Sequence, residues 1–426
     1  MEVFQDVKGS SKQLEFVLKG TRYQYANTLR RAIMTLVDTV AFRSDPPGVV
    51  LSSPDIKVVK NDSNTQPNEL LAHRISLLPI HNANPESWDP ERYVFKLEIM
   101  NQSSEPLDVT AGNITVFERR KGADMTVNLV EIPGRDFFPP NPKTQDTCII
   151  TTLPGKRSDA LIPTLLVEMR ATVGNGREHS RFIPTCQASY SYTQDTNTQR
   201  RNAYFEKWLA THKNVTDIEA LKKDAEKRGE FEREFKSMQI QRVYLVDERG
   251  DPNSFDFQIE TIGTLAPRTI LEKALLGIIL ICDKFTRVDV GELPASIRLV
   301  PSDTLMSGYD FLIQGQDYTF GNMIQTWLVD HHVDGEEKPA IVFAGFKVPH
   351  PLKDELLLRI GVEDNSEVTA RAALAVAARG CKAMFEGWLQ TWRGGKSAST
   401  AKTASTAAAG RTVFKLKKTP SGGGAT

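Results

Sequence analysis

The sequence is poor in cysteine and lacks any long apolar run. About 18 consecutive apolar residues, the minimum for a membrane-spanning helix, occur nowhere, and the first residues form no apolar segment of the kind that directs secretion. The four cysteines form no C-x-x-C pair, which argues against a disulfide framework and a zinc knuckle. They are Cys148, Cys186, Cys282 and Cys381. We therefore expect a chain that stays inside a cell, is not secreted and has no membrane partner.

The sequence also has no excess of charge of either sign. Lysine plus arginine and aspartate plus glutamate each total 53 among the 426 residues, so no overall field attracts nucleic acid or an acidic membrane. The balance is uneven along the chain, because residues 395–426 hold six basic residues and no acidic one. This segment is rich in small residues that bury little apolar surface, and we expect a disordered basic tail. Such a tail could touch nucleic acid or serve as a solubilising extension.

Motifs that carry catalysis are missing as well. The chain has no nucleophile elbow, no H-E-x-x-H zinc motif and no close cluster of aspartates for magnesium. Residues 395–397 end like a phosphate loop, but position 390 is Gln390 where that motif needs glycine. Adjacent histidines at 331–332, in an extended or turn segment, would point apart, and a structural hydrogen bond best explains His350 between two prolines. We predict no catalytic residue, no cofactor and no metal site.

One sequence unit occurs twice in this chain. Residues 16–29 and 311–324 match at a constant offset of 295, and Phe, Gly, Tyr and Asn recur identically. In each copy a strand-like run ends at a glycine, a polar turn follows, and Asn27 or Asn322 is placed to cap a helix. Each helix then presents an apolar stripe. The stripes include Leu29 and Ile33 in the first copy, and Ile324 and Leu328 in the second.

Each copy closes with a second helix. In the first copy Pro267 suits a helix start, and in the second the helix opens near Ser366 and carries Phe385 and Trp388 on an apolar seam. About 240 residues separate the two helices of the first copy and about 45 those of the second, so the first copy contains an insert. Alternating strand-like runs and a charged stretch at 200–242 predict a mostly β insert domain with one or two surface helices.

Two pairs of motifs within these copies are distinctive. The runs N-T-L-R-R-A-I-M at 27–34 and E-L-L-A-H-R-I-S-L-L-P-I at 69–80 resemble the third subunit of eukaryotic RNA polymerase II and the archaeal D subunit. The runs D-Y-T-F-G-N-M-I at 317–324 and V-F-A-G-F-K-V-P-H-P-L at 342–352 resemble the eleventh subunit and its archaeal L counterpart. The chain thus resembles a fusion of two α-like subunits of DNA-directed RNA polymerase, similar to that of large nucleocytoplasmic DNA viruses.

The resemblance implies an α+β fold in which two α-like dimerisation units pack as a pseudo-twofold intramolecular pair. The expected parts are a first unit at 1–78 and 248–286, an insert domain with a charged helical segment at 79–247, a second unit at 287–394 and the tail at 395–426. Joining the units makes their docking intramolecular, at an effective concentration on the order of mM. The residues expected to form the pairing core are Leu29, Ile33, Ile324, Leu328, Phe385 and Trp388.

The resemblance also implies partners and a location. A non-catalytic platform of this kind would hold the two largest polymerase subunits, carry small accessory subunits on its insert and meet template DNA only indirectly. It would act in the cytoplasm or nucleus of the host cell, and in the virion. Arg30 and Arg31 are forked donors suited to carboxylates or carbonyl groups of a partner. Residues that match them in α-like subunits lie where the large subunits dock, so we predict a partner interface at Arg30, Arg31 and Asn27, and assign Arg74 to the same surface.

Two other functions compete with this interpretation. One is a free-standing nucleic-acid-binding regulator that acts through the basic tail and would bind with a steep salt dependence. The electrically neutral body of the chain argues against it. The other is a hydrolase with a site in the insert, for which the sequence offers no constellation of residues.

Overall fold

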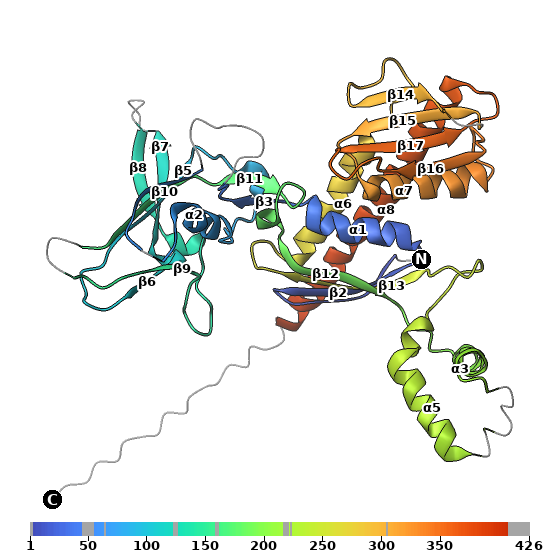
Figure 1. The fold of residues 1–426 in the computed structure, drawn as a ribbon, viewed down its shortest axis with the longest axis horizontal. Helices are drawn as coiled ribbons and strands as arrows, with labels where there is room; N and C mark the ends of the chain where they lie inside the picture. The colour runs from blue at the N-terminus through green and yellow to red at the C-terminus, as the bar shows by residue number, and fades with distance from the viewer. Residues whose placement is uncertain are drawn as a thin grey trace, which may run out of the picture.

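The computed structural model consists of two similar units packed together, an insert domain that extends to one side, and a pair of helices that projects from the other (Figure 1). It describes residues 3–44, 55–63, 65–121, 127–157, 162–215, 221, 224–303 and 306–407, with the backbone alone from 395 onward. A search of these ranges for a helix with the length and apolar character of a membrane span finds none.

The first unit is a four-stranded antiparallel sheet with two helices. Its elements are β1 (Phe4–Gly9), β2 (Gln13–Lys19), α1 (Tyr23–Thr35), β12 (Thr185–Tyr192), β13 (Ser254–Thr261) and α6 (Pro267–Asp283). The strand order is β1-β2-β13-β12. In β2, Leu14, Phe16 and Leu18 are buried and alternate with exposed or half-buried residues, so one face of the sheet packs on the helices. The turn from β2 into α1 places Gly20 at a φ of 74°, which glycine adopts without strain.

The second unit repeats this architecture. Its elements are β14 (Ile297–Pro301), β15 (Gly308–Gln314), α7 (Tyr318–Leu328), the π-helical turn η6 (Val329–Val333), β16 (Phe343–Lys347), β17 (Glu355–Gly361) and α8 (Glu367–Ala407). The strand order, β14-β15-β17-β16, matches that of the first sheet element for element. Gly315, with a φ of 72°, occupies the turn position of Gly20. The repeat in sequence is thus a repeat in structure, and the predicted α+β class is confirmed.

Both units share one hydrophobic core. Helix α1 packs against α6 and α7, and α8 packs against the same two helices. The Tyr25 ring lies 6.4 Å from that of Phe385, and the Phe320 ring lies 4.4 Å from that of Phe285, between ring centroids. Because Tyr25 and Phe320 are equivalent in the repeat, these two contacts are related by an approximate dyad. The same core contains the six residues predicted for the pairing: Leu29, Ile33, Ile324, Leu328, Phe385 and Trp388.

The insert domain is mostly β, as expected, and has its own core. Its elements are β3 (Asp38–Ala41), β4 (Ile56–Asn61), α2 (Asn68–Ser76), β5 (Tyr93–Met100), β6 (Leu107–Thr110), β7 (Ile114–Lys121), β8 (Val127–Ile132), β9 (Ile149–Leu153), β10 (Thr164–Met169) and β11 (Thr172–Asn175). Five strands form a sheet of order β4-β10-β5-β7-β8, and β3 pairs with β11 and β6 with β9.

Two helices, α3 (Thr198–His212) and α5 (Ala225–Met238), form the projecting pair and cross at a large angle (Figure 1). Asn197 caps α3 by accepting hydrogen bonds from the Gln199 and Arg200 amides. A third, small core around Trp208 and Phe235 holds these two helices together. These helices match the expected surface helices of the charged stretch.

The cores divide the chain differently from the predicted boundaries. Strands β3 and β4 and helix α2, predicted within the first unit, pack into the insert core through Val40, Ile56 and Leu71. Strand β12, predicted within the insert, completes the first sheet beside β13. Its sequence, T-C-Q-A-S-Y-S-Y, has little apolar alternation, so its position could not be recognised. Helix α8 continues to Ala407, into the segment predicted as a disordered tail, because alanine favours helix; residues 408–426 lie outside the described ones.

Truncation of Phe385 tests the shared core. We expect Phe385→Ala to lower the free energy of unfolding by about 3–5 kcal/mol, because it removes a fully buried ring and leaves a cavity between the units. Val368→Ala, on an exposed part of the same helix, should change it by less than about 0.5 kcal/mol. Urea denaturation of the full chain, followed by circular dichroism, measures both values. Equal effects of the two variants would contradict a shared core at Phe385.

Candidate functional site

The predicted interface lies on α1, and the helix starts earlier than predicted. It begins at Tyr23, with Arg22 as the residue before it. Asn27 therefore lies in the second turn, and the prediction that it caps the helix is wrong. Aromatic residues are moderate helix formers, which hid the start; the helix includes them because Tyr25 is buried against α8. The same holds in the second unit, where α7 begins at Tyr318.

Arg31 contacts the second unit of the same chain. Its guanidinium donates to Thr319 Oγ1 at 2.5 Å and to Asp317 Oδ2 at 3.2 Å. Asp317 in turn caps α7 by accepting a hydrogen bond from the Thr319 amide at 2.8 Å. Burial opposes ionisation of Asp317, but hydrogen bonds from Thr319 and the charges of Arg31 and Arg177 hold its pKa below the usual value. The structure thus places Arg31 in the internal pairing of the two units.

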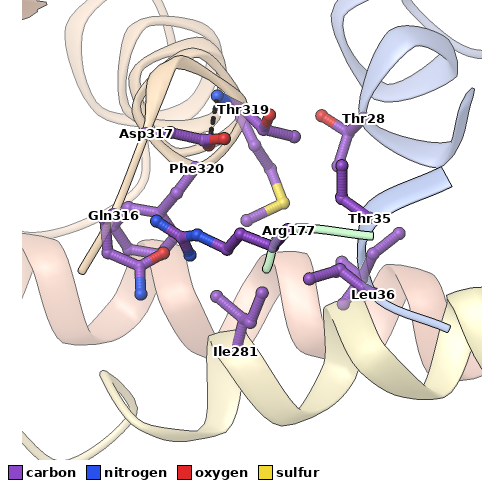
Figure 2. A pocket seen from close by; sticks show the side chains of 11 residues that line it. Thr28, Thr35, Leu36, Arg177, Ile281, Gln316, Asp317, Thr319 and Phe320 are labelled. Carbon is purple, nitrogen blue, oxygen red and sulfur yellow. Dashed lines mark hydrogen bonds between the residues drawn. The ribbon is translucent and has the colours of Figure 1, made fainter. Parts of the chain in front are cut away.

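Figure 2 shows the junction where both units and the insert meet. A cavity of about 30 Å³ lies there, which has room for a few water molecules at most and not for a substrate. Arg177, from the insert, extends into the junction and also donates to Asp354 Oδ1 of the second unit at 3.3 Å. The remaining lining residues come from α1, α6, α7 and the segments next to them: Thr28, Thr35, Leu36, Ile278, Ile281, Gln316, Asp317, Thr319, Phe320 and Met323.

Arg30 and Asn27 line a surface groove between α1 and β12. Arg30 Nε donates to Asn27 Oδ1 at 3.0 Å, which orients the guanidinium beside the groove. The opposite wall is residues 188–192 of β12, and the groove has a volume of about 420 Å³. Burial raises the pKa of Tyr190 and of Tyr192, while the charge of Arg30 acts on Tyr190 in the opposite direction. Both hydroxyls therefore remain protonated donors well above neutral pH.

Strand β12 is the last strand of its sheet in the described part of the chain. The outer edge of such a strand presents backbone N–H and C=O groups that a further strand can pair with. Together the groove offers an open strand edge, two tyrosines and one oriented arginine. This combination is suited to an extended protein segment, since main-chain pairing supplies affinity and the side chains supply specificity.

Arg74 lies on another surface, on α2 of the insert domain. Its Nη2 donates to the Ile149 carbonyl oxygen at 3.1 Å. Leu70, Leu77 and Ile149 around it are 56%, 48% and 55% exposed, so the arginine lies in an apolar patch. Figure 1 places α2 in the insert, apart from α1. The structure therefore does not bring Arg74 together with Arg30 and Arg31, because residues 69–80 fold into the insert core.

The histidines identified in the sequence have structural roles. Residues 330–332 lie in the π-helical turn η6, which continues α7, and not in the extended or turn segment we expected. His332 is buried, with Nδ1 2.9 Å from the Pro339 carbonyl oxygen. His350 Nδ1 accepts a hydrogen bond from the Leu352 amide at 3.1 Å, a structural bond of the expected kind. Across the described ranges there is no group of three His, Cys, Asp or Glu residues that could hold a metal ion.

Two ionic contacts between parts of the chain gave no signal in the sequence. Arg22 Nε lies 2.9 Å from Asp330 Oδ2 of the second unit, and Arg177 reaches Asp354 as described. The members of each pair are far apart in sequence, so local patterns do not connect them. The repeat alone could have drawn attention to Arg22, because it occupies the position that Asp317 occupies in the second copy.

These features define a protein built from two α-like dimerisation units, joined in one chain and paired through their helices. The chain belongs to the RNA polymerase Rpb3/Rpb11 dimerisation domain family, whose models match residues 15–282 and, separately, residues 309–391. Its homologues are non-catalytic assembly subunits of DNA-directed RNA polymerase, in agreement with the predicted non-catalytic role.

Individual relatives are similar to parts of this chain. The chain is 25% identical over 302 residues to the RNA polymerase subunit Rpo3 of Thermococcus kodakarensis, covering 67% of this chain and 96% of that protein. It is 25% identical over 304 residues to the RNA polymerases I and III subunit rpac1 of Dictyostelium discoideum, covering 62% and 75%. A stretch of 56 residues is 39% identical to a probable RNA polymerase II subunit RPB11 of Caenorhabditis elegans, covering 13% and 40%.

Asp317 should make the pairing of the units sensitive to acid. Its pKa is lower in the folded chain than in the unfolded one, so the stability it contributes is complete above about pH 5 and is lost as the pH falls through the folded value. Thermal unfolding between pH 6 and pH 3 should therefore show a larger loss of stability for the wild type than for Asp317→Asn, in which asparagine still caps α7. Parallel curves would contradict this assignment.

Proposed function

We propose that this chain is the assembly platform of a viral DNA-directed RNA polymerase, on which the two largest subunits are held together. The observation that carries the proposal is the shared core, because it joins a third-subunit-like unit and an eleventh-subunit-like unit into one body. A large subunit would meet a preassembled surface and would not wait for a heterodimer to form. The presence of both units in one chain is the feature that favours a large DNA virus as the source.

The connection between the units supports preassembly. Residues 284–296 link α6 to the second unit, and arginines of α8 hold this linker. Arg371 donates to the carbonyl oxygens of Val288 and Gly291 at 2.7 Å and 2.5 Å. Arg379 donates to the Thr286 carbonyl oxygen at 2.7 Å. A short, docked linker keeps the second unit next to the first, so the pair forms without a bimolecular search.

The outward surfaces suit different partners. The groove beside Arg30 fits an extended segment that carries a carboxylate, and we assign it to one of the two largest subunits. The apolar patch around Arg74 is of another kind, and we assign it to a second polymerase subunit. Small accessory subunits would occupy the rest of the insert, and template DNA would be reached only through the partners.

Charge reversal at Arg30 tests the platform. When the chain is co-expressed with the two largest subunits, we expect the wild type to co-purify with them at 1:1 and Arg30→Glu to recover at least about fivefold less of one of them. Arg298→Glu, on an exposed position of β14, is the matched control and should recover both. Arg30→Glu should melt like the wild type, since the side chain lies at a surface groove. Unchanged recovery would show that Arg30 does not bind a large subunit.

The basic tail favours a second candidate function, that of a nucleic-acid-binding regulator. Six basic residues without an acidic one in 395–426 are the observation in its favour. It predicts that the isolated full chain binds DNA or RNA with a steep salt dependence, and that truncation after Gly394 abolishes binding. The platform predicts instead that the truncated chain still assembles with the large subunits.

A further inference from the structure

The antiparallel helices α1 and α7 are joined at both ends by an arginine and an aspartate from opposite units. At one end Arg22 Nε lies 2.9 Å from Asp330 Oδ2, and at the other Arg31 Nη2 lies 3.2 Å from Asp317 Oδ2. The side chains are 26% and 15% exposed in the first pair and 37% and 39% in the second. Both pairs are thus partly shielded from water. Charges in such a partly buried position interact more strongly than charges on an open surface.

The repeat relates these four positions to one another. With the offset of 295, Arg22 of the first unit corresponds to Asp317 of the second, and each directly precedes the first residue of its helix. The same position therefore carries opposite charges in the two units. Their partners have uncharged equivalents, because Arg31 corresponds to Thr326 and Asp330 corresponds to Thr35.

This arrangement determines what each unit would meet in a second copy of itself. Two first units related by the same dyad would set Arg22 of one against Arg31 of the other, at both ends. Two second units would set Asp317 against Asp330, again at both ends. The mixed pair sets each arginine against an aspartate. Like charges placed together at an interface disfavour the wrong partner, and opposite charges favour the right one.

The apolar core makes no such distinction. Its equivalent residues on α1 and α7 are alike in the two units: Tyr25 matches Phe320, Leu29 matches Ile324, and Ile33 matches Leu328. Either unit could bury this surface against its own copy.

We infer that the Arg22–Asp330 and Arg31–Asp317 pairs select which units dock. They favour the first unit on the second and oppose the pairing of either unit with the same unit of another chain. This selection goes beyond the proposed polymerase role, and it acts whichever proteins bind on the outside. The selection would disfavour dimers in which the first units, or the second units, of two neighbouring chains pair with each other.

Arg22→Asp places an aspartate opposite Asp330 inside the full chain. This is the contact that Asp317 and Asp330 would make if two second units paired with each other. Arg22→Asn is its neutral counterpart, with a similar shape and a similar ability to cap α1. Arg22 also lies 3.9 Å from Asp251 of its own unit. Both variants are therefore made with Asp330 and with Asp330→Asn, a cycle of four proteins that isolates the contribution of Asp330.

With Asp330 present, we expect Arg22→Asp to melt at least about 2 °C below Arg22→Asn in low salt. With Asp330→Asn the difference should fall to less than half, and 0.5 M NaCl should reduce it as well. Arg298→Asp and Arg298→Asn, at an exposed position on β14, form the control pair and should melt alike. Thermal unfolding of the full chains gives all of these midpoints. The inference is overturned if Arg22→Asp and Arg22→Asn melt alike, or if their difference is the same with and without the Asp330 carboxylate.

Discussion

The burial of four helices against one another, between two equivalent sheets, is the constraint on which the rest of this structure depends. Each unit alone would leave one apolar helical face to water, and the pairing covers both faces at once. Alanines of α8, among them Ala370, Ala373 and Ala377, are fully buried and let the helices approach closely. Salt bridges of 2.6 Å between Lys382 and Asp283, and 2.9 Å between Arg393 and Glu272, border the contact of α8 with α6.

The repeat made much of this arrangement predictable. A shared pattern of strand, glycine turn and helix at a fixed offset implied two equivalent units, and the positive φ values of Gly20 and Gly315 are the physical reason that glycine recurs there. The apolar stripes also identified the residues that now lie in the common core. These features depend on local periodicity and backbone sterics, both of which can be read from the sequence.

Other features depend on contacts between distant residues, and the sequence did not reveal them. The helix starts were misjudged because Tyr25 becomes helical through burial against α8, which propensity does not report. Arg31 was assigned to an external surface, since nothing local indicates that Asp317 and Thr319 would face it. The boundaries of the insert were obscured for a related reason, because β12 is a polar strand whose position is decided by its pairing with β13.

The pairing of β3 with β11 has a consequence for how the chain reaches its native state. The first sheet must join Phe16 of β2 to Phe257 of β13, a connection that encloses the whole insert. Closing so long a loop in an unfolded chain reduces its conformational entropy. The resulting free-energy cost is on the order of (3/2)RT ln n for a loop of n residues, which is several kcal/mol here. The insert reduces this cost, because β3, where the chain enters the insert, pairs with β11, where the chain leaves it, with Ala41 opposite Thr172. During synthesis the insert emerges complete before β13, and an insert that folds at that stage would shorten the loop that remains to be closed when β13 pairs with β2.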